Sequence, residues 1–283
     1  MSYQDIRATD ESRVGSKVGD YVLDSIVGSG GVGIVYSAVG PDGTRVALKL
    51  VKAKHAADET FRRRFHREAR IGQTVHHPNV VPVLQTGEHD GLPYLAQRFI
   101  EGGSLAEKLE RDGRLNVQTI VQICSQVADG LEALSSAGMV HRDVKPANIL
   151  LDREGNAYIA DFGFAKVSQG TVLTAPGQAL GSMDYMAPEQ IRGDEVTAAT
   201  DVYALGCVIF ECLQGQPPFA DRQGVQVLLA HMQVEPPNLP ERDDVPLAFT
   251  ESMRVALRKE PAERPQSTTE YVRTLSQAAG LHE

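Results

Sequence analysis

The N-terminal part of the chain alternates short apolar runs with turn residues. From Tyr21 it reads YVLDSIV, then GSGGVG, then IVYSAV, a GPDG turn and TRVALKLV. β-Branched residues spaced in this way between turn signals are typical of strands in an antiparallel meander. VVPVLQTG and LPYLAQRFI add two further strands, and EGGS at 101–104 interrupts the pattern. We therefore expect an antiparallel sheet that ends at a boundary between two lobes.

One segment within this region has helical periodicity instead. Over 58–74 the sequence DETFRRRFHREARIGQT places Phe61, Phe65, Glu68 and Gly72 on one face, with most of the arginines around the rest. A carboxylate on an apolar face is unusual and indicates an opposite charge nearby.

Beyond residue 104 the pattern is mainly helical. NILL and AYIA flank an REGN turn and predict a small hairpin, and VYALGCVIFECL at 202–213 predicts a helix buried on all sides. Because that run has only about half of the residues that a bilayer span needs, we expect a soluble chain. Another helix is indicated by apolar residues at steps of four, three, four and three: Ile120, Cys124, Val127, Leu131 and Leu134.

Composition and charge narrow the choice of partners. The 283 residues are 42% hydrophobic, enough for one large domain or two lobes with separate cores. The net charge of -9 disfavours a nucleic-acid partner. The three cysteines lie in apolar patterns without the CxxC spacing of metal sites, so we expect buried thiols. The polar N-terminus has no apolar core, so we do not expect it to be a signal peptide.

A glycine-rich string and a lysine predict a phosphate site. Gly28, Gly30 and Gly33 have G-x-G-x-x-G spacing, which also serves dinucleotide-binding folds, but here a strand and a turn follow instead of a helix. At a hairpin tip such glycines let backbone N–H groups approach phosphate oxygens, although the tip could also be merely flexible. Lys49 follows in VALK, and an interior lysine needs a negative partner, which Glu68 would provide.

Oxygen ligands and cationic side chains are concentrated in two segments, HRDVKPANILL at 141–151 and DFG at 161–163. Asn148 and Asp161 suit magnesium. Asp143 would accept a proton from a hydroxyl or orient it, and Lys145 would neutralise a transferring phosphoryl group. His141 has no nucleophile pattern to activate and is interpreted as structural. Together these residues indicate a phosphoryl-transfer centre.

The motifs GSGGVGIV, VALK, HRDVKPAN, DFG and APE (187–189) occur in the order and spacing of the eukaryotic-like (Hanks-type) protein kinases, which this chain resembles. The resemblance implies an α+β, bilobal kinase fold over 17–278. The N-lobe (17–98) would be an antiparallel sheet with one main helix, and the C-lobe (99–278) mainly α-helical. Residues 1–16 and 279–283 would be flexible tails.

The resemblance also implies roles for single residues. Lys49, paired with Glu68, would contact the ATP phosphates, Asp143 would be the catalytic base beside Lys145, and Asn148 and Asp161 would hold Mg2+ or, in its place, Mn2+. Gln97 would be the gatekeeper, and Ile100 would recognise adenine through its backbone. The implied nucleotide contacts are Val27, Gly28, Gly30, Gly33, Val35, Ala47, Lys49, Gln97, Ile100, Asn148 and Asp161.

Structural and regulatory positions follow from the same resemblance. Glu189 would pair with Arg264, and Asp201 would receive the backbone of the catalytic loop, where Arg142 precedes Asp143. Ser168, Thr171 and Thr174 are candidate phosphoacceptors between DFG and APE, and their position relative to Gly181 favours Thr174 first and Thr171 second. A phosphate there could pair with Arg142, Lys166 or Arg67 and order the loop.

The implied function is an ATP-dependent protein serine/threonine kinase, since Lys145 marks Ser/Thr rather than Tyr kinases, with autophosphorylation and a role in bacterial signalling. DVYALGCVIFECLQGQPPF and GSMDYMAPEQ look most like the actinobacterial receptor-type kinases. Protein substrates with Ser/Thr acceptors, a cytoplasmic location, a homodimer through the N-lobe and a membrane span outside this chain are family expectations, with no membrane contact from the chain itself.

Two alternatives remain. A pseudokinase or scaffold usually lacks the lysine or one of the aspartates, whereas Lys49, Asp143 and Asp161 are all present. A small-molecule phosphotransferase of the aminoglycoside type shares the Asp and Asn spacing, but it lacks the APE segment and its salt-bridging arginine.

Overall fold

The computed structural model describes residues 11–161, 180–239 and 242–281. The chain divides into two compact units, one comprising the residues up to His76 together with Val81–Phe99, and the other comprising His77–Val80 and the residues from Ile100 onward.

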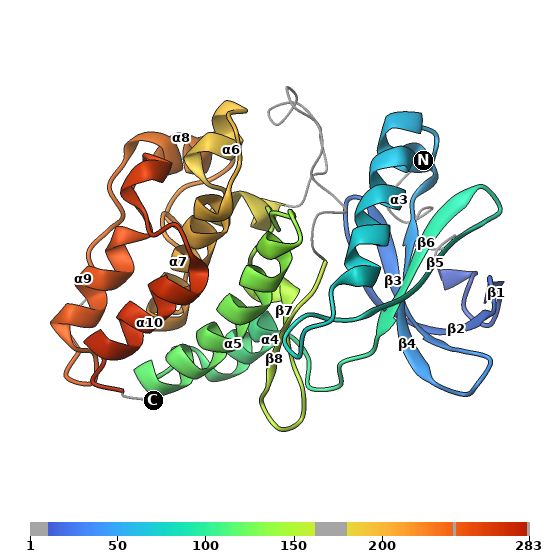
Figure 1. The fold of residues 1–283 in the computed structure, drawn as a ribbon, viewed down its shortest axis with the longest axis horizontal. Helices are drawn as coiled ribbons and strands as arrows, with labels where there is room; N and C mark the ends of the chain where they lie inside the picture. The colour runs from blue at the N-terminus through green and yellow to red at the C-terminus, as the bar shows by residue number, and fades with distance from the viewer. Residues whose placement is uncertain (1–10, 162–179, 240–241, 282–283) are drawn as a thin grey trace. The chain divides into compact units, whose positions relative to one another are not determined.

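The first unit is built on a six-stranded antiparallel sheet in the order β1-β2-β3-β4-β6-β5 (Figure 1). Tyr21 and Leu23 of β2 are buried while Val22 and Asp24, which alternate with them, are exposed, which is the period of two expected for a strand with one core face. Tyr36, Leu48 and Ala96 form the centre of this core. The strands are β1 (Lys17–Val18), β2 (Tyr21–Ser29), β3 (Gly33–Val39), β4 (Arg45–Val51), β5 (Val83–His89) and β6 (Leu92–Arg98).

Two helices complete this unit, the short α2 (Ala53–Ala56) and the main helix α3 (Glu59–Thr74). α3 begins where the Asp58 carboxylate accepts hydrogen bonds from the N–H groups of Thr60 and Phe61, as a helix cap requires. The predicted face is confirmed in part: Phe65, Glu68 and Gly72 are buried together with Ala69, whereas Phe61 is only half-buried.

Two details differ from the sequence-based expectations. The strand expected from residue 80 begins only at Val83, after Pro82, which has no N–H to donate to a ladder. The tail expected over 1–16 is paired at its end, because the Gly15 N–H donates to the Leu23 carbonyl and the Leu23 N–H to the Ser16 carbonyl.

The second unit is mainly helical, as expected. Its central helix α7 (Ala198–Gln214) lies among α5, α9 and α10 (Figure 1) and buries all but a few of its residues. The predicted hairpin is present as β7 (Ile149–Leu151) and β8 (Ala157–Ile159). The other elements are α4 (Leu105–Asp112), α5 (Val117–Ser136), η1 (Pro146–Asn148), η2 (Leu180–Tyr185), α6 (Pro188–Arg192), α8 (Val225–Gln233), α9 (Leu247–Val255), η3 (Pro261–Glu263) and α10 (Thr268–Ala278).

Several sequence predictions concern the core of this unit. All five apolar residues of the predicted stripe are buried on α5. Cys124, Cys207 and Cys212 are free and buried, and burial raises the pKa of the Cys124 thiol to about 12. Among the described residues, no helix is both long and apolar enough to cross a membrane.

Candidate active site

The sheet of the first unit places the predicted nucleotide contacts in two neighbouring rows. In one row Gly28 of β2 pairs with Val35 of β3, and Val35 pairs with Lys49 of β4. In the next row Ala47 of β4 pairs with Gln97 of β6. Because directly opposed residues share a face and positions two apart do too, Val35, Ala47, Lys49 and Gln97 lie on one face.

The two predicted charged partners in this unit are both buried. Lys49 on β4 and Glu68 on α3 are each only 7% exposed. The Arg67 guanidinium lies 3.8 Å from a Glu68 carboxylate oxygen. The gatekeeper candidate Gln97 is also buried, and its Nε2 has no hydrogen-bond partner in the described part of the chain.

A hydrogen bond within the glycine loop closes it, and two residues that sequence reasoning missed contact its carbonyl oxygens. The Gly30 N–H donates to the Gly33 carbonyl at 2.9 Å. Lys52 Nζ donates to the Gly30 carbonyl at 2.7 Å, and His55 Nε2 lies 3.1 Å from the Gly31 carbonyl oxygen. These contacts occupy carbonyl oxygens of the loop. A lysine and a histidine shortly after a strand give no motif by which they could have been found.

The third glycine is required by packing. A Cβ at Gly33 would lie 2.6 Å from the Leu50 carbonyl oxygen, whereas one at Gly28 or Gly31 would meet nothing within 4 Å. Within the predicted spacing, packing in the sheet therefore requires only Gly33, whereas Gly28 and Gly30 have room for a Cβ.

In the second unit the structure brings together three residues of HRDVKPAN. Asp143 Oδ2 lies 2.9 Å from Lys145 Nζ and accepts a hydrogen bond from Asn148 Nδ2 at 3.0 Å. Asn148 Nδ2 also donates to the Asp143 backbone carbonyl at 2.8 Å. Both donor bonds direct the amide nitrogen at Asp143, which leaves Asn148 Oδ1 as the atom that could meet a cation.

The loop that carries Asp143 is anchored from α7. The Asp201 carboxylate, which is 3% exposed, accepts the N–H groups of His141 and Arg142 at 2.8 and 2.9 Å. Burial raises the pKa of Asp201, and these two hydrogen bonds oppose that shift. Arg142 has a positive φ of 67°. Residues other than glycine adopt this backbone conformation only where the surroundings impose it.

His141 lies inside the hydrogen-bond network of this loop. Its Nδ1 accepts the Asp143 N–H at 3.2 Å, so the proton lies on Nε2, which donates to the Ala160 carbonyl at 2.9 Å. The Ala160 N–H in turn donates to the Asn148 carbonyl at 2.9 Å. Asp161 follows directly and has a positive φ of 59°. The backbone beside Asp161 is therefore fixed by the same loop that holds Asp143.

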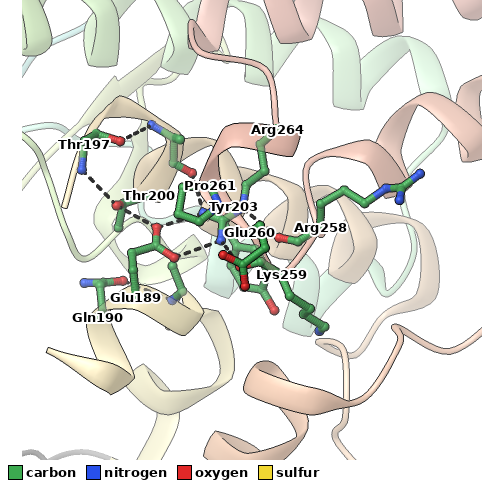
Figure 2. Close-up of polar contacts among 12 residues, drawn as sticks. Glu189, Gln190, Thr197, Thr200, Tyr203, Arg258, Lys259, Glu260, Pro261 and Arg264 are labelled. Carbon is green, nitrogen blue, oxygen red and sulfur yellow. Dashed lines mark hydrogen bonds and ion pairs between the residues drawn. The ribbon is translucent and has the colours of Figure 1, made fainter. Parts of the chain in front are cut away.

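The predicted pair of Glu189 and Arg264 is present and buried (Figure 2). Arg264 donates from two nitrogens to the two carboxylate oxygens, at 2.8 Å each, and Thr200 Oγ1 donates to Glu189 Oε1 at 2.8 Å. Arg264 also donates to the carbonyls of Ala199, Arg258 and Lys259. Gln190 of α6 donates to the Arg142 carbonyl at 2.9 Å, which joins this network to the loop of Asp143.

Some predicted residues stand apart from these groups. Val27 is exposed on β2, and Ile100 is buried at the start of the second unit. Thr171 and Thr174 lie outside the described residues. Within the described ranges, no three His, Cys, Asp or Glu side chains gather into a metal-binding group. A site of one carboxylate and one amide would thus need further ligands from phosphate or water.

Comparison with known proteins agrees with this geometry. Residues 21–274 match the family model described as "Protein kinase domain". The chain is 42% identical over 256 residues to "Serine/threonine-protein kinase PknH" of Mycobacterium bovis, covering 90% of this chain and 43% of that protein. It is 41% identical over 258 residues to "Serine/threonine-protein kinase PknE" of Mycobacterium tuberculosis, covering 90% of this chain and 45% of that protein. The chain thus spans less than half the length of these relatives.

Among solved structures, the PknI kinase domain of Mycobacterium tuberculosis superimposes with a TM-score of 0.77 at 28% identity, covering 94% of this chain and 98% of that one. The antiparallel sheet of the first unit and the helical second unit are those of that fold. The chain belongs to the protein kinase family.

Proposed function

We propose that this chain is an ATP-dependent protein serine/threonine kinase that acts in bacterial signalling. The observation that supports it most is the position of the Asp143 carboxylate, held between Lys145 Nζ at 2.9 Å and Asn148 Nδ2 at 3.0 Å. A carboxylate oriented by two donors can accept or align a hydroxyl proton, and its charge is balanced by the lysine that would also face a transferring phosphoryl group.

The residues present suit a magnesium-bound nucleotide. Asn148 Oδ1 and the Asp161 carboxylate are hard oxygen donors on one anchored segment, which is the donor chemistry that Mg2+ prefers and that Mn2+ accepts. Bound Mg-ATP would supply the γ-phosphoryl group and partial neutralisation of its charge. Lys49, on the face of β4 shared with Val35 and Ala47, would bind the phosphates near Glu68, and the glycine loop would offer backbone N–H groups.

The names of the relatives favour serine and threonine hydroxyls of proteins as acceptors. We further propose that the chain phosphorylates itself at Thr174 or Thr171, that it acts in the cytoplasm and that it can form a homodimer through its first unit. The competing function is a pseudokinase that binds nucleotide without transfer.

Intact-mass measurement with phosphosite mapping tests the proposal. Wild type and Asp143→Asn, both dephosphorylated first, are incubated with Mg-ATP and with casein as a general protein substrate. Phosphate on Ser or Thr of casein with wild type only would support the kinase. Phosphate on Thr174 or Thr171 would add the regulatory sites, and phosphate elsewhere on the chain would reject them. ATP binding without transfer by either protein would favour the pseudokinase.

A further inference from the structure

The helix α3 is positively charged, whereas the chain as a whole is negatively charged. The whole protein has a net charge of -9, yet Glu59–Thr74 holds five arginines against two glutamates. The phosphoryl-transfer chemistry proposed above uses only Glu68 of this helix. The arginines therefore need an explanation of their own.

Part of this charge surrounds a hollow within the first unit. Arg63, His66, Arg67, Arg70 and Gln73 line it from α3, and Thr86 lines it from β5. Its volume is about 460 Å³. The α3 positions follow steps of three and four, so they form one stripe on the helix, away from the buried stripe of Phe65, Ala69 and Gly72. Among the residues that line the hollow, every charged or titratable group is a guanidinium or an imidazole.

The carboxylates nearby neutralise this stripe only in part. Arg63 pairs with Glu59 at 2.9 Å, but both side chains are largely exposed, at 79% and 67%. The interaction free energy of such an exposed ion pair is small. Arg67 lies 3.8 Å from Glu68, beyond hydrogen-bond distance. Arg70 is exposed, and within the described ranges no carboxylate forms an ion pair with it. The hollow thus keeps guanidinium groups that an anion can engage.

We propose that this hollow binds a phosphorylated serine or threonine side chain of a partner protein. Guanidinium forks match phosphate oxygens in bidentate geometry, and several of them suit a group that carries close to two negative charges. Gln73 and Thr86 add neutral hydrogen-bonding groups at the wall. This site lies in a different unit from Asp143, and it does not depend on the proposed kinase activity.

Other anionic partners fit the hollow less well. A membrane surface is usually bound by basic residues together with apolar anchors, and none of the residues that line the hollow is apolar. A nucleic acid would present many phosphates to a chain of net charge -9, which would repel it outside the stripe. A single phosphorylated side chain engages the arginines without this repulsion.

Fluorescence polarisation with labelled peptides tests the proposal on dephosphorylated protein without nucleotide. Three glycine-alanine peptides carry a central phosphothreonine, threonine or glutamate. We expect the phosphothreonine peptide to bind at least about tenfold more tightly than the glutamate peptide, since phosphate adds charge and acceptor oxygens. Inorganic phosphate should compete only weakly if the peptide backbone contributes to binding.

The matched variants are Arg63→Ala/Arg70→Ala and Arg258→Ala/Arg273→Ala. Both remove two exposed arginines and change the net charge equally. Losing two charge-assisted contacts should weaken phosphopeptide binding by about 100-fold in the first variant and leave it unchanged in the second. Thermal melting verifies that both are folded.

Three outcomes would overturn the proposal. The phosphothreonine and threonine peptides could bind alike, or both double variants could weaken binding equally, which would indicate a general charge effect. Binding that depends on Arg63 and Arg70 but occurs only to vesicles of equal parts phosphatidylcholine and phosphatidylglycerol would assign the stripe to a membrane instead.

Discussion

Glu189 and Arg264 lie 75 positions apart in the chain and are joined by two hydrogen bonds of 2.8 Å. Their side chains are 2% and 0% exposed. A buried ion pair adds little compared with apolar packing, but removing one partner leaves a charge that nothing compensates. The pair therefore constrains how α6 meets the segment before α10.

Glu189→Gln should lower the free energy of unfolding by about 3–5 kcal/mol at neutral pH, because Arg264 would remain buried without its counterion. Urea denaturation measures this change. Arg192→Ala is the control, since Arg192 makes its ion pairs with Asp194 and Glu260 at the surface, and it should cost less than about 1 kcal/mol. Equal effects of the two substitutions would contradict the role assigned to the buried pair.

The same pair predicts a pH dependence. Burial alone would raise the pKa of Glu189, but the hydrogen bonds and charge of Arg264, with those of the backbone and Thr200, outweigh burial and lower it. A carboxyl whose pKa is lower in the folded state stabilises the protein above its unfolded pKa, and the contribution is lost as the pH falls through the folded pKa. The difference between wild type and Glu189→Gln should therefore shrink below about pH 4. A difference that stays constant on acidification would exclude this linkage.

Gly33→Ala should destabilise the first unit by about 1–3 kcal/mol, because the new Cβ would press on a backbone atom of β4 that cannot rotate away. That atom, the Leu50 carbonyl oxygen, lies 2.6 Å from the Cβ position and next to Lys49. We also expect a higher KM for ATP. Gly31→Ala is the control, since its Cβ would meet nothing within 4 Å. Thermal melting and ATP titration of both variants measure the two effects, and a stable Gly33→Ala protein would show that β3 and β4 can separate locally.

Asp201→Asn should lower kcat with little change in KM for ATP. The amide has only one oxygen for the two N–H groups of His141 and Arg142, so one buried donor would lose its acceptor. We expect a loss of about 1–3 kcal/mol in stability. A displacement of the loop by about 1 Å would cost about 100-fold in rate. Asp152→Asn, at the exposed turn where Asp152 accepts the N–H groups of Glu154 and Asn156, should leave kcat unchanged. Similar kcat values for Asp201→Asn and Asp152→Asn would show that Asp201 does not position Asp143 for catalysis.

The parts of this structure that the sequence predicted are those set by local pattern. The alternation of Tyr21 to Asp24 and the helical stripe of Phe65, Glu68 and Gly72 each follow from a period that a few residues define. The pair of Glu189 and Arg264 required a family resemblance, because no local period connects residues that far apart. The Lys52 and His55 contacts to the glycine loop and the cationic hollow on α3 depend on tertiary folding. The positive φ of Arg142 likewise arises from Asp201, which lies 59 positions away.

Asn148 has two roles that one substitution can separate. Its Nδ2 donates to the carbonyl and to a carboxylate oxygen of Asp143, at 2.8 and 3.0 Å, and its Oδ1 is the proposed cation ligand. Asn148→Asp keeps an oxygen for the cation and removes both donors. It also places a carboxylate against Asp143, and two such groups cannot both ionise freely.

We expect kcat of Asn148→Asp to fall by about 100-fold, since Asp143 would lose its orientation or take up a proton, while the half-saturating magnesium concentration would not rise. The remaining activity should increase with pH as the shared proton leaves. Asn156→Asp is a matched control, because Asn156 Nδ2 also donates to an aspartate, Asp152, at 2.9 Å but in an exposed turn. Steady-state kinetics at varied magnesium and pH measure all three effects. A variant that keeps its kcat but needs more magnesium would show that Asn148 acts on the cation alone and that its hydrogen bonds to Asp143 are dispensable.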